Sequence, residues 1–220
     1  MIKEPSYRAR WGLAATVQAA ILRRLRRWVG LRIYGVYFQP LEWPAGPDPV
    51  VPGFSARLFQ PGEAEALIAC AKSPELDLSE AFVRDALGKG DVCLAILRDG
   101  AIVSYGWCAF TPTHDEEGVF VGFGASYRYA YNWFTLPEYR GRHFLRAFKP
   151  IRDRYCATTR GCTRSIAFIA LDKRSSIRTA LAIGQRRVGT AGYLKCGPIF
   201  WPFATAGARE HGFYFFIPPR

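Results

Sequence analysis

The 220-residue sequence contains no internal repeat, no low-complexity tract and no Cys-x-x-Cys pair. Its six cysteines lie far apart, and its three histidines do not cluster with them. A structural zinc site needs paired ligands, so no metal is expected. We expect reduced thiols in a cytosolic protein, because cysteine within apolar runs behaves as a small hydrophobic residue. The cysteines are Cys70, Cys93, Cys108, Cys156, Cys162 and Cys196.

A long apolar run is also missing. The stretch Trp11–Leu22 has basic residues on both sides, as a signal peptide would, but it includes Gln18 and leads into four closely spaced arginines. A membrane-spanning helix needs about 20 predominantly apolar residues, which is more than this stretch supplies. Neither secretion nor a membrane span is therefore expected.

Acidic residues are scarce. The chain has 18 of them against 30 lysines and arginines, a net charge of +12, while 50% of its residues are hydrophobic. This hydrophobic content excludes an intrinsically disordered chain. The net charge alone fits nucleic acid, an anionic membrane or an acidic protein.

The basic charge falls in two blocks. Residues 1–40 hold eight basic and one acidic side chain, and residues 140–187 hold thirteen and two. Residues 41–139 between them are acidic, with six basic and fourteen acidic side chains. A protein that coats nucleic acid spreads its positive charge more evenly, so a nucleic-acid partner is not expected.

Three regions follow from the composition. Residues 1–40 predict a basic amphipathic leader helix and a short strand: Leu13, Val17, Ile21, Leu25 and Trp28 recur at helical spacing, with the arginines expected on the other face. Residues 41–52 are rich in proline and predict a linker. Residues 53–220 form the expected main domain.

Strand and helix patterns alternate along the main domain, which predicts an α/β (α+β) fold with a mostly antiparallel mixed sheet flanked by helices. The Asp99-Gly100 pair between two apolar runs predicts a hairpin with a type I′ turn, because such turns need positive φ at both central residues. The expected strands are 54–59, 92–97, 101–110, 127–136, 165–171, 189–195 and 213–217. The expected helices are 62–71, 79–87, 143–156 and 175–183, and 112–118 is expected to be an acidic loop.

The most informative segment runs from Trp133 to Leu145. A strand that ends at Pro137 is followed by a basic turn containing glycine and then by a helix. Such a turn presents free backbone N–H groups and the positive end of a helix dipole, which suits phosphate or pyrophosphate. Arg140 and Arg142 add positive charge; the alternative is a polar loop before a solvated helix start.

This segment resembles the phosphate loop of the GNAT N-acyltransferase superfamily, whose pattern is Val-x-Pro-x-Tyr-Arg-Gly-x-Gly-x-Gly. Pro137, Tyr139, Arg140 and Gly141 match it, and Thr135 takes the place of Val. The stretches 172–178 and 183–189 resemble the family's last strand–helix–strand passage. The resemblance implies a GNAT-like acyltransferase domain over residues 53–220, with acetyl-CoA or another acyl-CoA as donor and a primary amine as acceptor.

Two departures from the family pattern stand out. His143 and Leu145 occupy places where the family has glycine, so the backbone should approach a pyrophosphate more tightly, and side chains would have to compensate. The family's tyrosine that protonates the leaving thiolate would fall at Ala180. The resemblance therefore implies that the general acid is missing or comes from elsewhere.

The resemblance also implies site residues. Trp133 and Thr135 would contact the pantetheine arm through their backbone, and Arg140, Gly141, Arg142, His143 and Phe144 would hold the phosphates. The catalytic candidates on the same face of the strand are Tyr131 and Tyr129, although tyrosine, with a pKa near 10, is a weak base. The alternatives in the acidic loop are His114, Glu116 and Glu117.

Partners follow from the charge blocks. The leader helix would bind an anionic membrane surface, or would pack on the domain or on a second subunit in a homodimer. The block at 140–187 exceeds what one CoA needs, so an acidic acyl-carrier protein is an alternative donor. A non-catalytic membrane or nucleic-acid adaptor is a third possibility. The basic leader favours an amino sugar or lipid precursor as acceptor, for a cytoplasmic protein at the inner face of the membrane.

Overall fold

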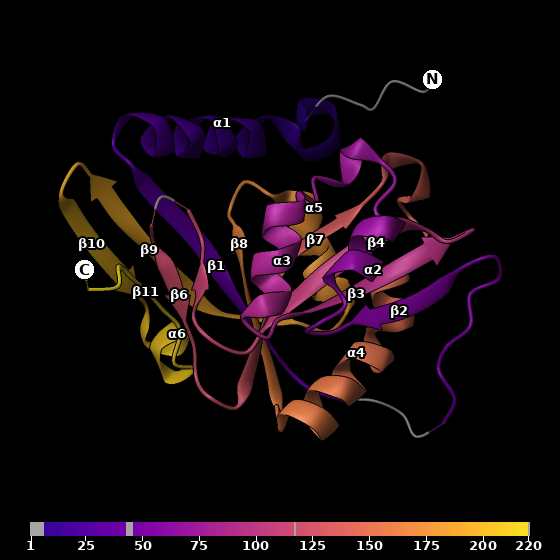
Figure 1. Ribbon diagram of the computed structural model, residues 1–220. Helices are drawn as coiled ribbons and strands as arrows, with labels where there is room; N and C mark the ends of the chain where they lie inside the picture. The colour runs from indigo at the N-terminus through magenta and orange to yellow at the C-terminus, as the bar shows by residue number, and fades with distance from the viewer. Residues whose placement is uncertain (1–6, 43–45, 117, 220) are drawn as a thin grey trace. The chain divides into compact units, whose positions relative to one another are not determined.

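The computed structural model describes residues 7–42, 46–116 and 118–219 (Figure 1). The chain divides into two compact units. Unit 1 comprises Met1–Phe38, Thr113–Gly124 and Phe168–Arg220, and unit 2 comprises Gln39–Pro112 and Ala125–Ala167. The division of the chain predicted from the sequence, with its boundaries at 40 and 52, stays a prediction.

Unit 2 is built on a mixed sheet with the strand order β2-β3-β4-β7-β8. The strands are β2 (Ser55–Phe59), β3 (Val92–Arg98), β4 (Ala101–Ala109), β7 (Tyr127–Thr135) and the first part of β8 (Arg164–Ala170). Neighbours are antiparallel except β7 and β8, which run parallel. The helices are α2 (Ala64–Cys70), α3 (Glu80–Gly88) and α4 (Phe144–Arg160), with short 3-10 turns η1 (Pro74–Leu76) and η2 (Pro137–Tyr139).

The two faces of this sheet are covered by different helices. On one face, the Trp107 ring contacts Phe82 of α3 with ring centroids 5.1 Å apart, and the hydroxyl of Tyr105 donates to the Leu76 carbonyl. The next residue along β4, Cys108, points the other way and meets Cys156 of α4. Apolar side chains are buried on both faces, which explains why β3 and β4 are continuous apolar runs in the sequence.

The turn between β3 and β4 has the geometry that its sequence predicts. Arg98 pairs with Ala101, which leaves Asp99 and Gly100 as the two central residues. Both have positive φ, 51° and 72°, as a type I′ turn requires. The hairpin prediction is confirmed.

Strand β7 contains an irregularity that the sequence did not reveal. Asn132 has φ 47°, and the pairing of β4 with β7 shifts register between Tyr105 and Trp107. This is a β-bulge, and it reverses the alternation of side chains along β7. Tyr131 lies opposite Trp107, whereas Trp133 stacks on Gly106, where a Cβ atom would come within 1.8 Å of its ring.

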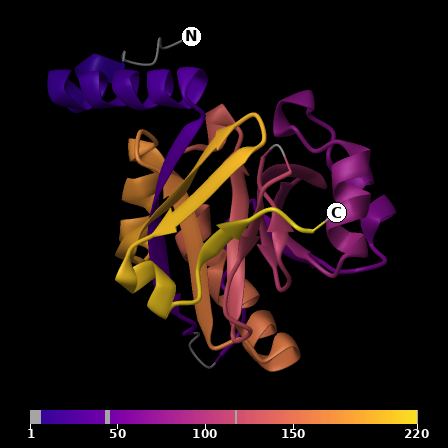
Figure 2. The ribbon, with the colours of Figure 1, turned by 90° about the vertical axis from the view of Figure 1, so that its left-hand side faces the viewer.

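Unit 1 contains two antiparallel sheets, with the strand orders β10-β9-β1 and β11-β6-β5. The first is formed by β1 (Leu31–Pro40), β9 (Arg186–Cys196) and β10 (Ile199–Ala204), and the second by β5 (Thr113–His114), β6 (Phe120–Gly122) and β11 (Tyr214–Phe216). The helices are α1 (Tyr7–Trp28), α5 (Arg174–Ala182) and α6 (Ala206–Glu210). In Figure 2, α1 is the indigo helix that leads into β1.

The leader helix is present, with a kink at Gly12, where φ is 82°. The residues on its buried and exposed faces differ from the prediction. Ala15 and Ala19 are buried, while Leu13, Val17, Ile21 and Trp28 are exposed, and arginines border this apolar stripe instead of lying opposite to it. The small residues, not the large apolar ones, therefore form the face of α1 that packs on the rest of unit 1.

The predicted fold class is confirmed: the chain is a mixed α/β protein with mostly antiparallel strands and flanking helices. Four strands and helices were not predicted: β5, β6, β10 and α6. Strand β10 contains Pro202, which is tolerated because β10 lies at an edge. The segment expected to be an acidic loop contributes the short strand β5.

Candidate functional site

The basic turn after β7 leads into the N-terminus of α4. Gly141 has φ 81°, and His143, the residue before the helix, has φ 57° and ψ 29°. No side chain caps this helix end, and its first turn contains no acidic residue. The positive end of a 17-residue helix therefore carries no acidic counter-charge from its own first turn.

The left-handed conformation of His143 explains one departure from the family pattern. Glycine adopts such a backbone at no cost, but histidine is among the residues enriched there. His143 thus keeps a conformation typical of glycine while adding an exposed imidazole at the start of the helix. Whether that side chain contacts a phosphate stays a prediction.

Arg140 and Arg142 are both exposed in this turn. The Nε of Arg140 donates to the Thr135 carbonyl at 3.3 Å. The guanidinium of Arg142 lies 5.3 Å from the ring centre of Phe54 and 5.7 Å from that of Tyr139. Cation–π contacts of this kind hold a cation near an aromatic surface while its N–H groups remain available to an anion.

Tyr131 meets a carboxylate that lies 40 residues earlier in the sequence. Its hydroxyl donates a hydrogen bond to the Oδ2 of Asp91, which follows α3. The Nζ of Lys89 lies 3.2 Å from the same oxygen and 5.8 Å from the centre of the Tyr131 ring. The three residues form a compact polar cluster, which we call the Asp91 cluster.

Burial dominates the electrostatics of the Asp91 cluster. The side chain of Asp91 is fully buried, and no group in the described part of the chain forms a hydrogen bond with its Oδ1. Burial raises the pKa of Asp91 to about 6, with the Tyr131 hydroxyl and Lys89 acting in the opposite direction. Burial and the neighbouring Asp91 also raise the pKa of Tyr131, so its phenol stays protonated. A carboxylate that titrates near pH 6 is suited to accept a proton.

Tyr129, the second tyrosine candidate, lies beside Tyr131 on the same face of β7. The two rings are stacked, with centroids 5.4 Å apart and an angle of 8° between their planes. Tyr129 is buried, whereas Tyr131 is half-buried. This arrangement makes Tyr131 the more accessible of the two.

The expected position of Trp133 and Thr135 on the same face as the two tyrosines is wrong. Because of the bulge at Asn132, Thr135 lies opposite Ser104, and their hydroxyls are 2.7 Å apart on the face that carries Trp133. Tyr131 and Phe134 lie on the other face, opposite Trp107 and Tyr105. Asparagine tolerates positive φ, but nothing in the alternating aromatic pattern indicated where the alternation would reverse.

The candidates from the acidic loop lie in unit 1. His114 belongs to β5, and its Nε2 accepts a hydrogen bond from the Gly118 N–H at 3.1 Å. Glu116 forms ion pairs with Arg26 at 2.7 Å and with Arg32 at 2.8 Å. Glu116 therefore joins α1 to β1, which is a structural role. Glu117 lies outside the described residues.

A second group of buried charges lies on the α4 side of the sheet in unit 2. Asp153 is within 2.6 Å of both Arg128 of β7 and Lys149, and the Nε of Arg152 lies at 3.5 Å. Burial acts to raise the pKa of Asp153, but Arg128 and Arg152 outweigh it and the pKa is lowered. We call this group the Asp153 cluster. Its ion pairs join α4 to β7. The guanidinium of Arg152 also lies 5.6 Å from the centre of the Trp133 ring.

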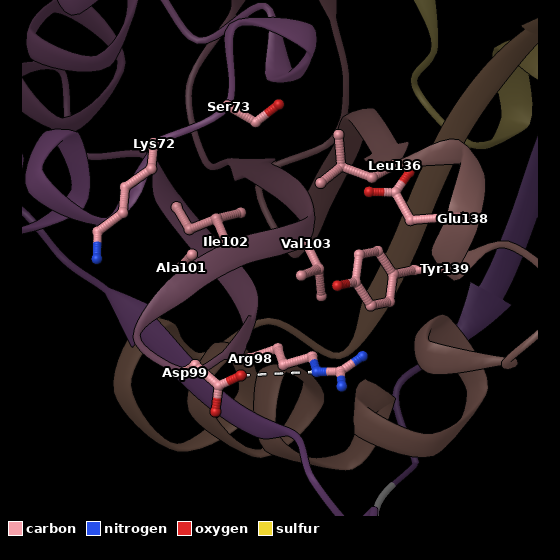
Figure 3. A pocket seen from close by; sticks show the side chains of 10 residues that line it. All are labelled: Lys72, Ser73, Arg98, Asp99, Ala101, Ile102, Val103, Leu136, Glu138 and Tyr139. Carbon is pink, nitrogen blue, oxygen red and sulfur yellow. Dashed lines mark ion pairs between the residues drawn. The ribbon is translucent and has the colours of Figure 1, made fainter.

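A cavity of about 570 Å³ opens beside the β3–β4 hairpin and the turn after β7 (Figure 3). Its lining carries charges of both signs. Lys72 and Arg98 are basic, and Asp99 and Glu138 are acidic. None of the side chains proposed from the sequence for catalysis or phosphate binding lines it. We therefore do not assign this cavity to the acyl donor.

Sequence reasoning missed Asp91. The residue follows Gly90 at the start of an apolar strand, which reads as an ordinary polar strand boundary. Its contact with Tyr131 depends on α3, β3, β4 and β7 being packed together, so no local pattern could have revealed it. The only available signal was the isolated acidic residue directly before a buried strand.

No protein-family model and no curated protein matches the sequence. A tandem GNAT protein from the clavulanic acid biosynthesis pathway is 16% identical, with a TM-score of 0.50 over 86% of this chain and 55% of that chain. A putative GNAT acetyltransferase from Novosphingobium aromaticivorans is 16% identical, with a TM-score of 0.44 over 72% and 62%. An aminoglycoside N-acetyltransferase in complex with CoA is 14% identical, with a TM-score of 0.45 over 61% and 91%.

The chain spans little more than half the length of the first two of these proteins. At such low identity the likeness concerns the fold alone. The similarity to the tandem protein extends over 86% of this chain. The chain therefore has the fold of the GNAT superfamily.

Proposed function

We propose that the protein is an N-acyltransferase that moves an acetyl or other acyl group from acyl-CoA to a primary amine. The observation that carries the proposal is the β7–turn–α4 passage. It combines the Pro137–Gly141 motif, a left-handed residue before the helix and an uncapped helix start. On a GNAT fold, this is the arrangement that suits the diphosphate of CoA.

The residues of the turn fit such a group. The N-terminus of α4 offers backbone N–H groups, its first turn has no acidic side chain, and Arg140 and Arg142 are exposed next to it. A Cβ atom at Gly141 would meet nothing within 4 Å, so the chain leaves space beside the turn. The backbone of Trp133 and Thr135 remains the proposed contact for the pantetheine arm.

The Asp91 cluster supplies a route for the proton of the amine. The bound donor would provide a thioester carbonyl for the amine to attack. Tyr131 is half-buried and can touch the amine, while Asp91 is fully buried behind it. As the amine nitrogen bonds to the acyl carbon, the carbon–sulfur bond of the thioester would break and CoA would leave as its thiolate. The Tyr131 oxygen accepts the proton of the amine and passes its own to Asp91 Oδ2. The carboxylate thus overcomes the weakness of tyrosine as a base.

Direct binding tests the proposal. Acetyl-CoA is titrated into the full chain, and Arg140→Ala is expected to weaken binding about tenfold, because a charge-assisted hydrogen bond is lost. The matched control is Arg154→Ala on the same helix, whose side chain pairs with Asp48 and lies outside the turn. An absence of binding at millimolar acetyl-CoA, or an equal loss in both variants, would contradict the proposal.

One observation favours a second donor. Residues 140–187 hold thirteen basic and two acidic side chains, and several of the basic ones are exposed on α4 and α5. An acidic acyl-carrier protein would complement this charge. In that case transfer would require the carrier protein, would not occur from free acyl-CoA, and would fall steeply with salt concentration. Thiol release in an amine library would exclude a non-catalytic adaptor in either case.

The acceptor is proposed only as a class. The basic leader helix supports an amine close to an anionic surface, such as an amino sugar or a lipid precursor. A screen of amines for thiol release, with and without vesicles, would separate these from water-soluble acceptors.

A further inference from the structure

We propose that the outward face of α1 binds an anionic lipid surface. The proposal is independent of the acyl transfer proposed above, because it concerns a face of unit 1 that contains no site residue. It rests on three features of α1: how the helix is fixed, what it exposes and which charges accompany the exposed side chains.

The orientation of α1 on unit 1 is fixed by polar contacts along its length. Arg174 of α5 donates to Gln18 at 2.6 Å, and Arg26 pairs with Glu116 at 2.7 Å. Near the start of the helix, the guanidinium of Arg178 lies 5.4 Å from the centre of the Trp11 ring. Ala15 and Ala19 are buried on the inner face of the helix, so together with these contacts they leave the opposite face turned outward.

The outward face is apolar and exposed. Leu13 is 59% exposed, Ile21 52% and Trp28 80%, and Val17 lies between the first two. At 100° per residue these four side chains fall within one stripe along the helix. Single exposed apolar residues are ordinary, but a stripe running from just after the kink at Gly12 to the last turn marks an interaction surface.

The charges beside the stripe point to an anionic partner. Arg23, Arg24 and Arg27 are exposed, and Arg24 lies within the stripe itself. The sequence of α1 contains no aspartate or glutamate. An apolar stripe with tryptophan at one end and arginines along it is the pattern of a helix that lies in a lipid interface.

The same charges disfavour a second copy of the chain as the occupant. In a two-fold dimer the same face of both copies meets, so the arginines of one helix would approach the arginines of the other. Within α1 there is no acidic side chain to compensate them. A bilayer of anionic lipid satisfies both the apolar stripe and the charge. No helix within the described residues is both long and apolar enough to span a membrane, so the proposed mode is contact along the surface.

Vesicle binding of the full chain tests the proposal. Co-sedimentation is measured with vesicles of phosphatidylcholine alone and with vesicles containing 30% phosphatidylglycerol, at physiological salt. We expect at least tenfold tighter binding to the anionic vesicles, since each arginine near such a surface contributes about fivefold. Equal binding to both, or none to either, would overturn the proposal.

Variants locate the surface. Ile21→Glu and Trp28→Ala are each expected to weaken binding about tenfold, because each removes apolar area from the stripe. The matched control is Val50→Glu, which adds the same charge at an exposed position of unit 2. Melting curves establish that all variants fold, and Trp28→Ala adds no charge. An equal effect of Ile21→Glu and Val50→Glu would overturn the proposal.

A second copy of the chain is the alternative partner for the stripe, and a separate measurement tests it. Sedimentation of the chain without vesicles reports whether it self-associates. A monomer supports the lipid surface as the partner of α1. A dimer that Ile21→Glu dissociates and Val50→Glu does not would overturn the proposal, because the stripe would then be an interface between copies.

Discussion

Asp91 and Asp153 are two fully buried carboxylates in unit 2, but their surroundings shift their pKa values in opposite directions. Asp153 is surrounded by Arg128, Lys149 and Arg152, and its pKa is lowered. Among the described residues, Asp91 has one ion-pair partner, Lys89, together with the Tyr131 hydroxyl, and burial raises its pKa to about 6.

The difference separates a structural carboxylate from a reactive one. Asp153 stays charged because its neighbours compensate the cost of burial, so it holds β7 and α4 together. Asp91 is compensated only in part, so it can exchange a proton near neutral pH. The predictions below test this contrast, beginning with the largest effect.

Asp153→Asn should destabilise the protein by about 3–5 kcal/mol, because it leaves Arg128, Lys149 and Arg152 without a buried counter-charge. Urea unfolding of the variant and the parent measures the change. Asp99→Asn serves as the control, since the Asp99 side chain is 93% exposed and its loss should be almost neutral. A small loss of stability in Asp153→Asn would show that Asp153 is not a structural carboxylate.

Asp91→Asn should reduce acyl transfer at least about 100-fold, because the proton acceptor is lost. The same change should stabilise the fold. The pKa of Asp91 is about 6 in the folded protein against an ordinary value of 3.8, so the unfolded state loses its proton first as the pH rises. The parent therefore loses about 2 kcal/mol between pH 4 and pH 7 that the variant keeps.

Denaturant unfolding of Asp91→Asn and of the parent at pH 4 and pH 7 checks the second part. The advantage of the variant should be absent at pH 4 and present at pH 7. A variant that is less stable than the parent at pH 7 would show that Asp91 is structural, like Asp153.

Lys149→Met should cost about 1–2 kcal/mol, because it removes one of three cations around Asp153 while keeping an apolar stem. Urea unfolding is again the measurement. Because Arg128 and Arg152 remain, we expect the loss to stay well below that of Asp153→Asn. An equal loss would mean that Lys149 alone balances the carboxylate.

Lys89→Met should move the pH profile of acyl transfer upward by about 1 unit, because the cation that lowers the pKa of Asp91 is lost. In the parent, activity should rise with pH through about 6, since the carboxylate form of Asp91 accepts the proton. Rates measured from pH 5 to pH 8 in both proteins test this. An unchanged profile would indicate that another group titrates.

The features that could be predicted from the sequence are local. Asp99-Gly100 specifies its own turn, and the Pro137–Gly141 motif lies between a strand and a helix that are both evident from their patterns. The Asp91 cluster could not be predicted, because its members come together only after three strands and a helix have packed. The reversal of the side-chain alternation at Asn132 could not be predicted either, because no glycine or proline indicates it.

The bulge at Asn132 has a consequence for the length of β7. A single residue decides which side of the sheet each later side chain faces, so the strand is sensitive to insertion and deletion more than to substitution. Because Asn132 is the extra residue, deleting it would leave Trp133 on Gly106 and Phe134 opposite Tyr105, whereas adding or deleting a residue elsewhere in β7 would turn the side chains beyond that point to the other face. Residue count, as well as residue identity, is therefore part of what this strand encodes.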